Sequence, residues 1–200
     1  MDCLKYARQN NCEWNEYVTI HSAAKGFLST LKWAYENGLE LCEYVCSYAA
    51  SGGHLECLKF AREMDCKWAK ETCSAAAAGG HFECLKYARE NGCHWDKDTT
   101  RNAAKYGHFE CLVWARENGC EWDSTTTRDA AAGGHLDCLI WAHENGCHWT
   151  REACLFAASH GNFETFTYAV LGGCAWDPNE CYRITNSKKI ESWILSFLEN

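Results

Sequence analysis

The sequence has almost no proline, no long apolar run and no excess of basic charge. A single proline in 200 residues argues against a β-sandwich with many proline-marked turns. No apolar run approaches the ~20 residues that span a bilayer, and the first residues lack the basic and apolar regions of a signal peptide. The formal net charge of −8 argues against a nucleic-acid or membrane partner, which favours a basic face.

What the sequence does contain is typical of a folded chain, with one exception. Hydrophobic residues make up 47% and charged residues 23%, which excludes a disordered chain. The exception is cysteine, with 16 residues. The explanation lies in an internal repeat, because four segments run from a cysteine to a tryptophan at a constant spacing of 27 residues: 57–68, 84–95, 111–122 and 138–149.

The register of this repeat extends over nearly the whole chain. It runs backwards to residues 3–14 and forwards to 165–176, and the one weak copy, 30–41, has Leu39 and Leu41 where cysteine and tryptophan are usual. We expect an N-terminal half-repeat at 1–14, six repeats at 15–176 and a C-terminal capping repeat at 177–200, all in one continuous solenoid domain. A 27-residue period also suits leucine-rich repeats, but their Leu-x-x-Leu-x-Leu strand pattern is absent.

Each repeat reads as two short helices joined by a tight turn. The first helix is predicted at about 97–105, with small inward residues such as Ala103 and Ala104 and with Asp96 as its N-cap. The second is predicted at about 81–92, where apolar and charged residues alternate with a period of 3.6. All-α structure follows, and circular dichroism dominated by strand would contradict it.

Two residue types recur so strictly that they predict structural roles. Glycine stands at the turn between the helices, where a positive φ is expected: Gly26, Gly53, Gly80, Gly107, Gly134 and Gly161. Tryptophan recurs in the linker between repeats, where its ring can fill the gap between helix pairs: Trp14, Trp68, Trp95, Trp122, Trp149 and Trp176.

These units resemble ankyrin repeats. The stretch from Ala103 to Leu112, Ala-Ala-Lys-Tyr-Gly-His-Phe-Glu-Cys-Leu, is similar to the ankyrin run Ala-Ala-x-x-Gly-His-x-Glu-Val-Val. The Thr-Pro-Leu-His signature and the β-hairpin fingers of ankyrins are missing, so the chain resembles the short, Cys- and Trp-rich arrays of giant DNA viruses of amoebae and of some protists and algae. The resemblance implies an ankyrin-like solenoid that binds a protein, and a histidine after the turn glycine that bonds to neighbouring turn backbone.

Repetition also explains the cysteines better than disulfides or metal do. Equivalent positions in stacked helix pairs lie roughly 10 Å apart, whereas a disulfide needs Cα atoms within about 7 Å. No CxxC pair exists, and the CxxxC of Cys42 and Cys46 has no second pair at zinc-finger spacing. We therefore expect free thiols, no metal, no cofactor and a reducing, cytoplasmic location, in a host cell or virion if the chain is viral.

Catalysis is not predicted either. The Gly-His pairs occur in four equivalent surroundings, whereas an active site needs one special place. A Ser or Cys nucleophile with a histidine base stays open, although nothing breaks the repeat to form a pocket for it. The Lys/Arg/Glu stripe of the second helix reads as a solvated face. We expect a non-enzymatic protein-binding scaffold.

Function is expected where the repeats differ. Two adjacent first-helix positions vary freely, and by resemblance to ankyrins that helix faces a concave, partner-binding surface; the alternative is drift on a solvated face. The candidate partner-binding residues are His21, Tyr48, Arg101, Asn102, Arg128, Asp129, Leu155 and Phe156.

A second function remains open at the N-terminal end. The chain begins on a second helix in which Leu4, Tyr6 and Ala7 keep the register of interior copies, with nothing before them to cover that side. The chain is then a piece of a longer array, or this end self-associates or docks a partner, or it is a frayed half-repeat. Structural self-assembly by end-to-end stacking is therefore the alternative to the scaffold.

Overall fold

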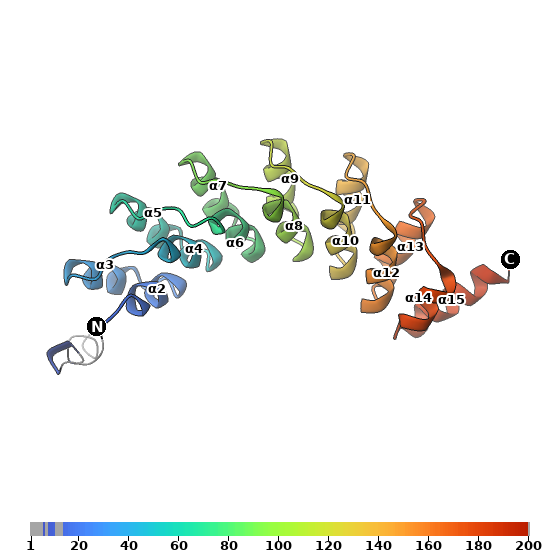
Figure 1. Ribbon diagram of the computed structural model, residues 1–200, viewed down its shortest axis with the longest axis horizontal. Coiled ribbons are helices and arrows are strands. Elements are labelled where there is room, and N and C mark those ends of the chain that lie inside the picture. Colours follow the sequence, from blue (N-terminus) through green and yellow to red (C-terminus); the bar gives the residue numbers. More distant parts are fainter. Residues whose placement is uncertain (1–5, 7, 11–13, 200) are drawn as a thin grey trace. The chain divides into compact units, whose positions relative to one another are not determined.

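The computed structural model describes residues 6, 8–10 and 14–199, and in this part of the chain it contains helices and no strand (Figure 1). The chain divides into two compact units, Met1–Trp95 and Asp96–Asn200. Each unit is a stack of helix pairs. The fold is therefore the all-helical repeat that the sequence predicts.

In each unit the first helices of the pairs form one row and the second helices form another (Figure 1). The first helices are α2 (Tyr17–Ala24), α4 (Glu43–Ser51) and α6 (Thr72–Gly79) in unit 1, and α8 (Lys97–Lys105), α10 (Ser124–Gly133), α12 (Arg151–His160) and α14 (Pro178–Ile184) in unit 2. The second helices are α3 (Leu28–Glu36), α5 (Leu55–Glu63) and α7 (Phe82–Glu90) in unit 1, and α9 (Phe109–Glu117), α11 (Leu136–Glu144), α13 (Phe163–Leu171) and α15 (Lys188–Leu198) in unit 2.

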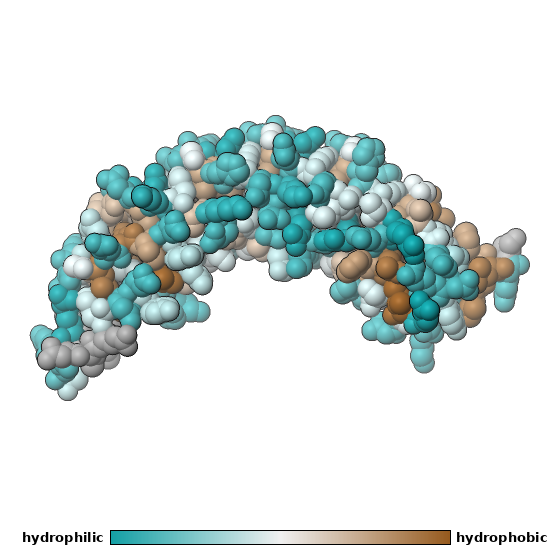
Figure 2. Space-filling view, viewed as in Figure 1, coloured by the Kyte–Doolittle hydropathy of each residue, from teal (hydrophilic) through white to brown (hydrophobic). Residues whose placement is uncertain are grey.

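The two rows pack differently because their side chains differ in size. The alanine pairs of the first helices are fully buried, as at Ala103 and Ala104, and the first helices pack closely against one another along the row. The second helices α3, α5, α7, α9 and α11 each bury a leucine at the same position, such as Leu85, and α13 has Phe166 there, while larger rings beside it, such as Tyr87, are half-buried. Hydrophilic residues dominate the outer surface of the second-helix rows (Figure 2).

The turn glycines have a left-handed backbone, and the next repeat closes over them. Gly53 has φ +73°, and a Cβ built there would lie 2.5 Å from the ring of His81. His54 covers Gly26 in the same way, and its Nε2 lies 3.1 Å from the carbonyl oxygen of Ala24, to which it donates as the Nε2–H tautomer. The histidine therefore ties one repeat to the turn of the repeat before it, as expected.

One repeat makes the same tie with a different residue. Asn162 stands where the histidine is usual, and its Nδ2 donates to the carbonyl oxygen of Ala132 at 2.6 Å. The Asn162 side chain also covers Gly134, whose φ is +77°. A side-chain N–H directed at the preceding turn is thus the shared requirement, and either residue type meets it.

The predicted N-cap Asp96 is confirmed, and Asp123 caps the next first helix in the same way. Asp96 accepts a hydrogen bond from the backbone N–H of Asp98 at 3.0 Å, and Asp123 accepts one from Thr125 at 2.9 Å. Each satisfies one of the unpaired N–H groups that begin a helix. The helix predicted at 97–105 is α8, with those bounds.

The N-terminal expectation falls mostly outside the described residues. Leu4 and Ala7 are not among them, and Tyr6 is exposed. At the other end, α15 packs on α13 and α14, and Trp193 contacts the rings of Phe166 and Trp176 at centroid distances of 5.7 and 5.9 Å. The last helix therefore packs on Trp176, the final tryptophan of the repeat register.

Candidate protein-binding face

The first-helix row of unit 2 carries a hollow of about 390 Å³ lined by α8, α10 and α12. Four of the candidate partner-binding residues predicted from the sequence line it: Arg101, Arg128, Asp129 and Phe156. Lys105 and His160 also contribute to the wall. The structure thus brings together residues that lie in three different repeats.

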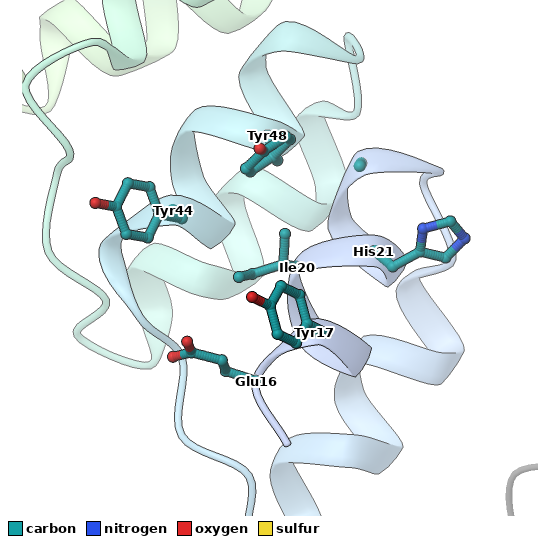
Figure 3. A pocket seen from close by; sticks show the side chains of 7 residues that line it. Glu16, Tyr17, Ile20, His21, Tyr44 and Tyr48 are labelled. Atoms are coloured by element: carbon teal, nitrogen blue, oxygen red, sulfur yellow. The ribbon is translucent and has the colours of Figure 1, made fainter. Parts of the chain in front are cut away.

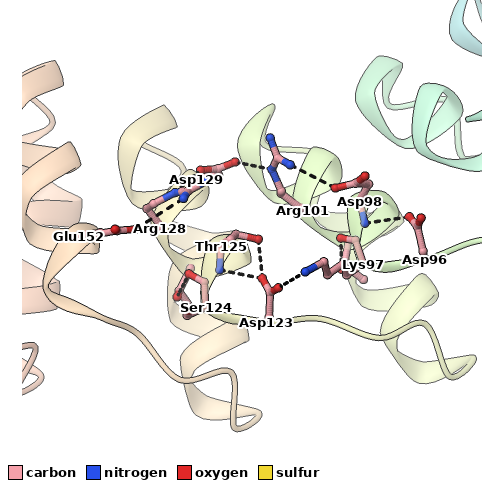
Figure 4. A network of polar contacts seen from close by, with 12 residues as sticks. Asp96, Lys97, Asp98, Arg101, Asp123, Ser124, Thr125, Arg128, Asp129 and Glu152 are labelled. Carbon is pink, nitrogen blue, oxygen red and sulfur yellow. Dashed lines mark hydrogen bonds and ion pairs between the residues drawn. The ribbon is translucent and has the colours of Figure 1, made fainter.

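Most of the charges in this hollow are paired with one another (Figure 4). Asp129 accepts from the Nε of Arg101 at 2.8 Å and from the Nε of Arg128 at 2.7 Å. The two arginines also reach outwards, Arg101 to Asp98 at 3.1 Å and Arg128 to Glu152 at 3.5 Å. The network therefore links α8, α10 and α12.

Asp129 is a structural member of this network. Asp129 is only 7% exposed, so little of its surface is accessible to a partner. Burial by itself raises the pKa of the carboxyl, but the hydrogen bonds from Arg128 and Arg101 outweigh it and hold the pKa below its usual value. Asp129 stays ionised at neutral pH and orients both guanidinium groups.

A second ion pair connects the start of α8 with the start of α10. Lys97 Nζ donates to Asp123 Oδ2 at 2.7 Å, and this hydrogen bond, with a second from Thr125, lowers the pKa of Asp123 to about 2. Asp123 is also the N-cap of α10. The same carboxylate thus starts one helix and joins it to its neighbour.

The first-helix row of unit 1 carries a larger hollow of about 560 Å³, lined by α2 and α4 (Figure 3). Two of the predicted residues, His21 and Tyr48, line it, and the imidazole of His21 points away from the tyrosines. The rings of Tyr17, Tyr44 and Tyr48 surround Ile20. This hollow differs from that of unit 2 in having exposed aromatic rings in place of paired charges.

The two remaining predicted residues do not line either hollow. Asn102 and Leu155 are half-buried on α8 and α12. Tyr17 and Tyr44 were not among the predicted residues, because they occupy a different position of the first helix from the two variable positions. The signal was present, because the other repeats carry no aromatic residue there: Glu71, Asp98, Thr125, Glu152 and Asn179.

The cysteines form contacts between different positions of the repeat, which a comparison of equivalent positions does not detect. Cys46 on α4 donates to Cys66 with an Sγ–Sγ distance of 3.5 Å, well beyond the about 2.05 Å of a disulfide. The cysteines after α5, α9, α11 and α13 also donate to a backbone carbonyl 24 residues earlier, as Cys120 does to Asp96 at 3.1 Å and Cys147 to Asp123 at 3.2 Å. These thiols fasten each linker to the start of the first helix.

The linker tryptophans contact rings of the following repeat. Trp14 meets Trp33 at a centroid distance of 5.3 Å, and Trp122 meets Trp141 at 5.7 Å. The Nε1 of Trp68 donates to the carbonyl oxygen of Asn91 at 3.0 Å. Each of these contacts joins two successive repeats.

The arginines of the charged stripe on the second helix pack against these tryptophans. The expectation that the whole stripe is solvated is therefore wrong at the arginine position. The guanidinium carbons of three arginines lie 4.4 to 4.5 Å from the ring centroids: Arg62 over Trp68, Arg89 over Trp95 and Arg116 over Trp122. In the next repeat His143 takes the arginine's place and stacks on Trp149 at 3.5 Å. The arginine is thus a packing residue at this position.

The described residues contain no group of three or more His, Cys, Asp or Glu side chains that is suitable for a metal ion. Within the same residues, no helix is both long and apolar enough to cross a membrane. The first-helix face has two hollows that a partner could contact, one lined by tyrosine rings in unit 1 and one lined by arginines in unit 2.

The comparisons agree with this architecture. No protein-family model matches the sequence, and none of the curated proteins matches it. Among solved structures, the human ASB11 ankyrin repeat domain superposes with a TM-score of 0.69 at 19% identity, over 88% of this chain and 96% of that one. At this identity the likeness concerns the fold alone. The chain has the ankyrin-repeat fold, built from short repeats of two helices.

Proposed function

We propose that this protein is a non-enzymatic scaffold that binds a protein partner through its first-helix face. Ankyrin repeats are a general protein-interaction fold, and the observation that carries the proposal here is the pair of hollows between neighbouring first helices. Both are lined by residues that change from repeat to repeat and that the repeat itself does not require.

The partner-binding residues of the proposal are those that the sequence singles out, with the two tyrosines that the structure adds. They are His21, Tyr48, Arg101, Asn102, Arg128, Asp129, Leu155 and Phe156, together with Tyr17 and Tyr44. Asp129 is buried, so its part in the proposal is to orient Arg101 and Arg128 and not to contact the partner. Exposure favours the aromatic members, because Tyr17 is 70% and Tyr48 49% exposed, and large exposed rings are common anchors of interfaces. The thiol hydrogen bonds support a reducing, intracellular location.

Site-specific photo-crosslinking in the native cell tests the proposal. A photoreactive phenylalanine analogue replaces Tyr48 or Phe156 on the first-helix face, and a matched control replaces Lys86, half-buried on the second helix α7. We expect the first-helix positions to capture a common protein, identified by mass spectrometry, and the control to capture none of it. Capture from α7 alone, or only of further copies of this chain, would contradict the proposal.

A further inference from the structure

The hollow of unit 1 has three tyrosine rings that the fold does not require. Tyr17 is 70%, Tyr44 47% and Tyr48 49% exposed. Polar residues stand at the positions of Tyr17 and Tyr44 in the other repeats, so a stable helix pair forms without an aromatic residue there. The rings therefore expose apolar surface to water for a reason other than packing.

The charge around these rings is negative. Glu16 lies at the edge of the hollow (Figure 3) and also lines an adjoining hollow of about 420 Å³, which it shares with Tyr17 and Glu40. Neither hollow has a lysine or arginine among its described lining residues. No described cation pairs with Glu16 or Glu40, in contrast to the network of Asp129 in unit 2.

Aromatic faces beside carboxylates attract a cation. A guanidinium or ammonium group over a tyrosine face gains about 0.5–1 kcal/mol at an exposed site and more when desolvated. The chain itself uses such stacking elsewhere, where Arg62 lies 4.5 Å from the ring centroid of Trp68. Over Tyr17, Tyr44 and Tyr48, by contrast, no described cation lies.

We propose that the hollow of unit 1 binds a basic segment of the protein partner, with an arginine side chain held among Tyr17, Tyr44 and Tyr48 and neutralised by Glu16. Arginine fits better than lysine, because a planar guanidinium stacks on a ring while its edge donates to a carboxylate. This inference rests on the proposed function and specifies the chemistry of the partner.

Binding of labelled hexa-arginine to the full chain tests it, by fluorescence anisotropy at low ionic strength. We expect the double variant Tyr17→Ala/Tyr48→Ala to bind roughly tenfold more weakly. The matched control is Tyr106→Ala, because Tyr106 in unit 2 is also 49% exposed and lies outside the hollow. Far-ultraviolet circular dichroism checks that the variants are folded.

A second pair of variants separates local from overall charge. Glu16→Gln and Glu117→Gln remove the same charge, but the exposed Glu117 lies on the second helix α9. We expect only Glu16→Gln to weaken binding, and hexa-lysine to bind less tightly than hexa-arginine.

Several outcomes would overturn the inference. If the hollow variants and the control variants lost the same amount of hexa-arginine affinity, the peptide would be attracted non-specifically to an acidic chain. If the unsubstituted chain did not bind hexa-arginine, there would be no cation site. Equal binding of a neutral Gly-Ser peptide would show that the hollow does not select a cation. In each of these cases the crosslinking result still stands, so failure here is distinguishable from failure of the proposed scaffold.

Discussion

Two glycines of unit 2 share a left-handed backbone but differ in their surroundings. Gly107 has φ +74° and Gly119 has φ +86°. A Cβ at Gly107 would run into the ring of His135, whereas a Cβ at Gly119 would meet nothing within 4 Å. The two positions therefore separate backbone strain from the crowding of the next repeat.

We expect Gly119→Ala to lower the free energy of unfolding by about 1 kcal/mol, the cost of a side chain in this backbone region. Gly107→Ala should lower it further, and Gly107→Val further still, because the added atoms displace His135. Urea unfolding followed by circular dichroism measures each loss. Equal losses for the two alanine variants would show that His135 moves aside at no cost.

Asp65 is the exception at the turn after the second helix. Its φ is +57°, and it is the one residue other than glycine with a positive φ among the described residues. Equivalent positions in other repeats have glycine, as at Gly92 and Gly146. We expect Asp65→Gly to raise the free energy of unfolding by roughly 0.5–1 kcal/mol through relief of this strain. Thermal unfolding measures the effect, with Asp65→Ala, which keeps the strain, as the control that should not be stabilised.

Residue-level features were predictable from the sequence only where they repeat. The glycines of the turns recur at a fixed spacing, which indicates a backbone requirement at each one. The pairing of Arg101 with Asp129 occurs once and joins positions 28 residues apart, so no periodicity indicates it. For that reason the sequence predicted Asp129 as a partner-binding surface residue, although it is buried.

At the scale of the elements, the second helices α5, α7 and α9 are each joined to the following linker by a stack of arginine on tryptophan. Arg116 lies 4.5 Å from the ring centroid of Trp122, and its Nη1 donates to the carbonyl oxygen of Cys120 at 3.3 Å. A planar cation makes both contacts at once, which an ammonium group does less well. The arginine therefore fixes the path of the chain after the helix ends.

We expect Arg116→Lys to lower the free energy of unfolding by about 0.5–1 kcal/mol, since the stack and the carbonyl contact are lost together. The reverse exchange, His143→Arg, should be tolerated, because it restores the residue that stands over tryptophan in three other repeats. Urea unfolding followed by tryptophan fluorescence measures both. A destabilised His143→Arg with an unaffected Arg116→Lys would contradict a shared role at this position.

The helices themselves were predictable because propensity, capping and period agree. The range predicted for the helix at 97–105 equals that of α8, and its N-cap is the predicted Asp96. The contacts of the linkers were not predictable in this way, because Cys46 and Cys66, which are in contact, occupy different positions of the repeat. A sequence period relates only equivalent positions of neighbouring repeats. It therefore gives no sign of a contact between two different positions, such as that of Cys46 with Cys66.

At the scale of the whole molecule, the buried thiols make stability depend on pH in alkaline solution. Burial, the largest cause, raises the pKa of Cys84 and Cys111 to about 11 and that of Cys138 to about 12. In the unfolded chain these thiols lose their protons near pH 8.5. Between these limits the unfolded state holds fewer protons than the folded state, and stability falls as pH rises.

We therefore expect the free energy of unfolding to be insensitive to these thiols below about pH 8.5 and to decrease up to about pH 11, each thiol adding at most about 1.4 kcal/mol per pH unit. Urea midpoints at a series of alkaline pH values measure the slope. The control is Cys84→Thr, because threonine occupies the same position at Thr30 and Thr165. An unchanged slope in this variant would show that the thiol does not titrate on unfolding.

The tie of His54 to the turn at Gly26 has a consequence for how such a chain can grow. From residue 42 to residue 176, each repeat has a turn glycine followed directly by the histidine or asparagine that reaches the turn of the preceding repeat, so a copy of such a repeat contains both partners of the joint. A duplication in the gene that copies one whole repeat brings a matching joint with it. The length of the array is therefore open to change by single events, while the first-helix residues of each copy are free to diverge afterwards.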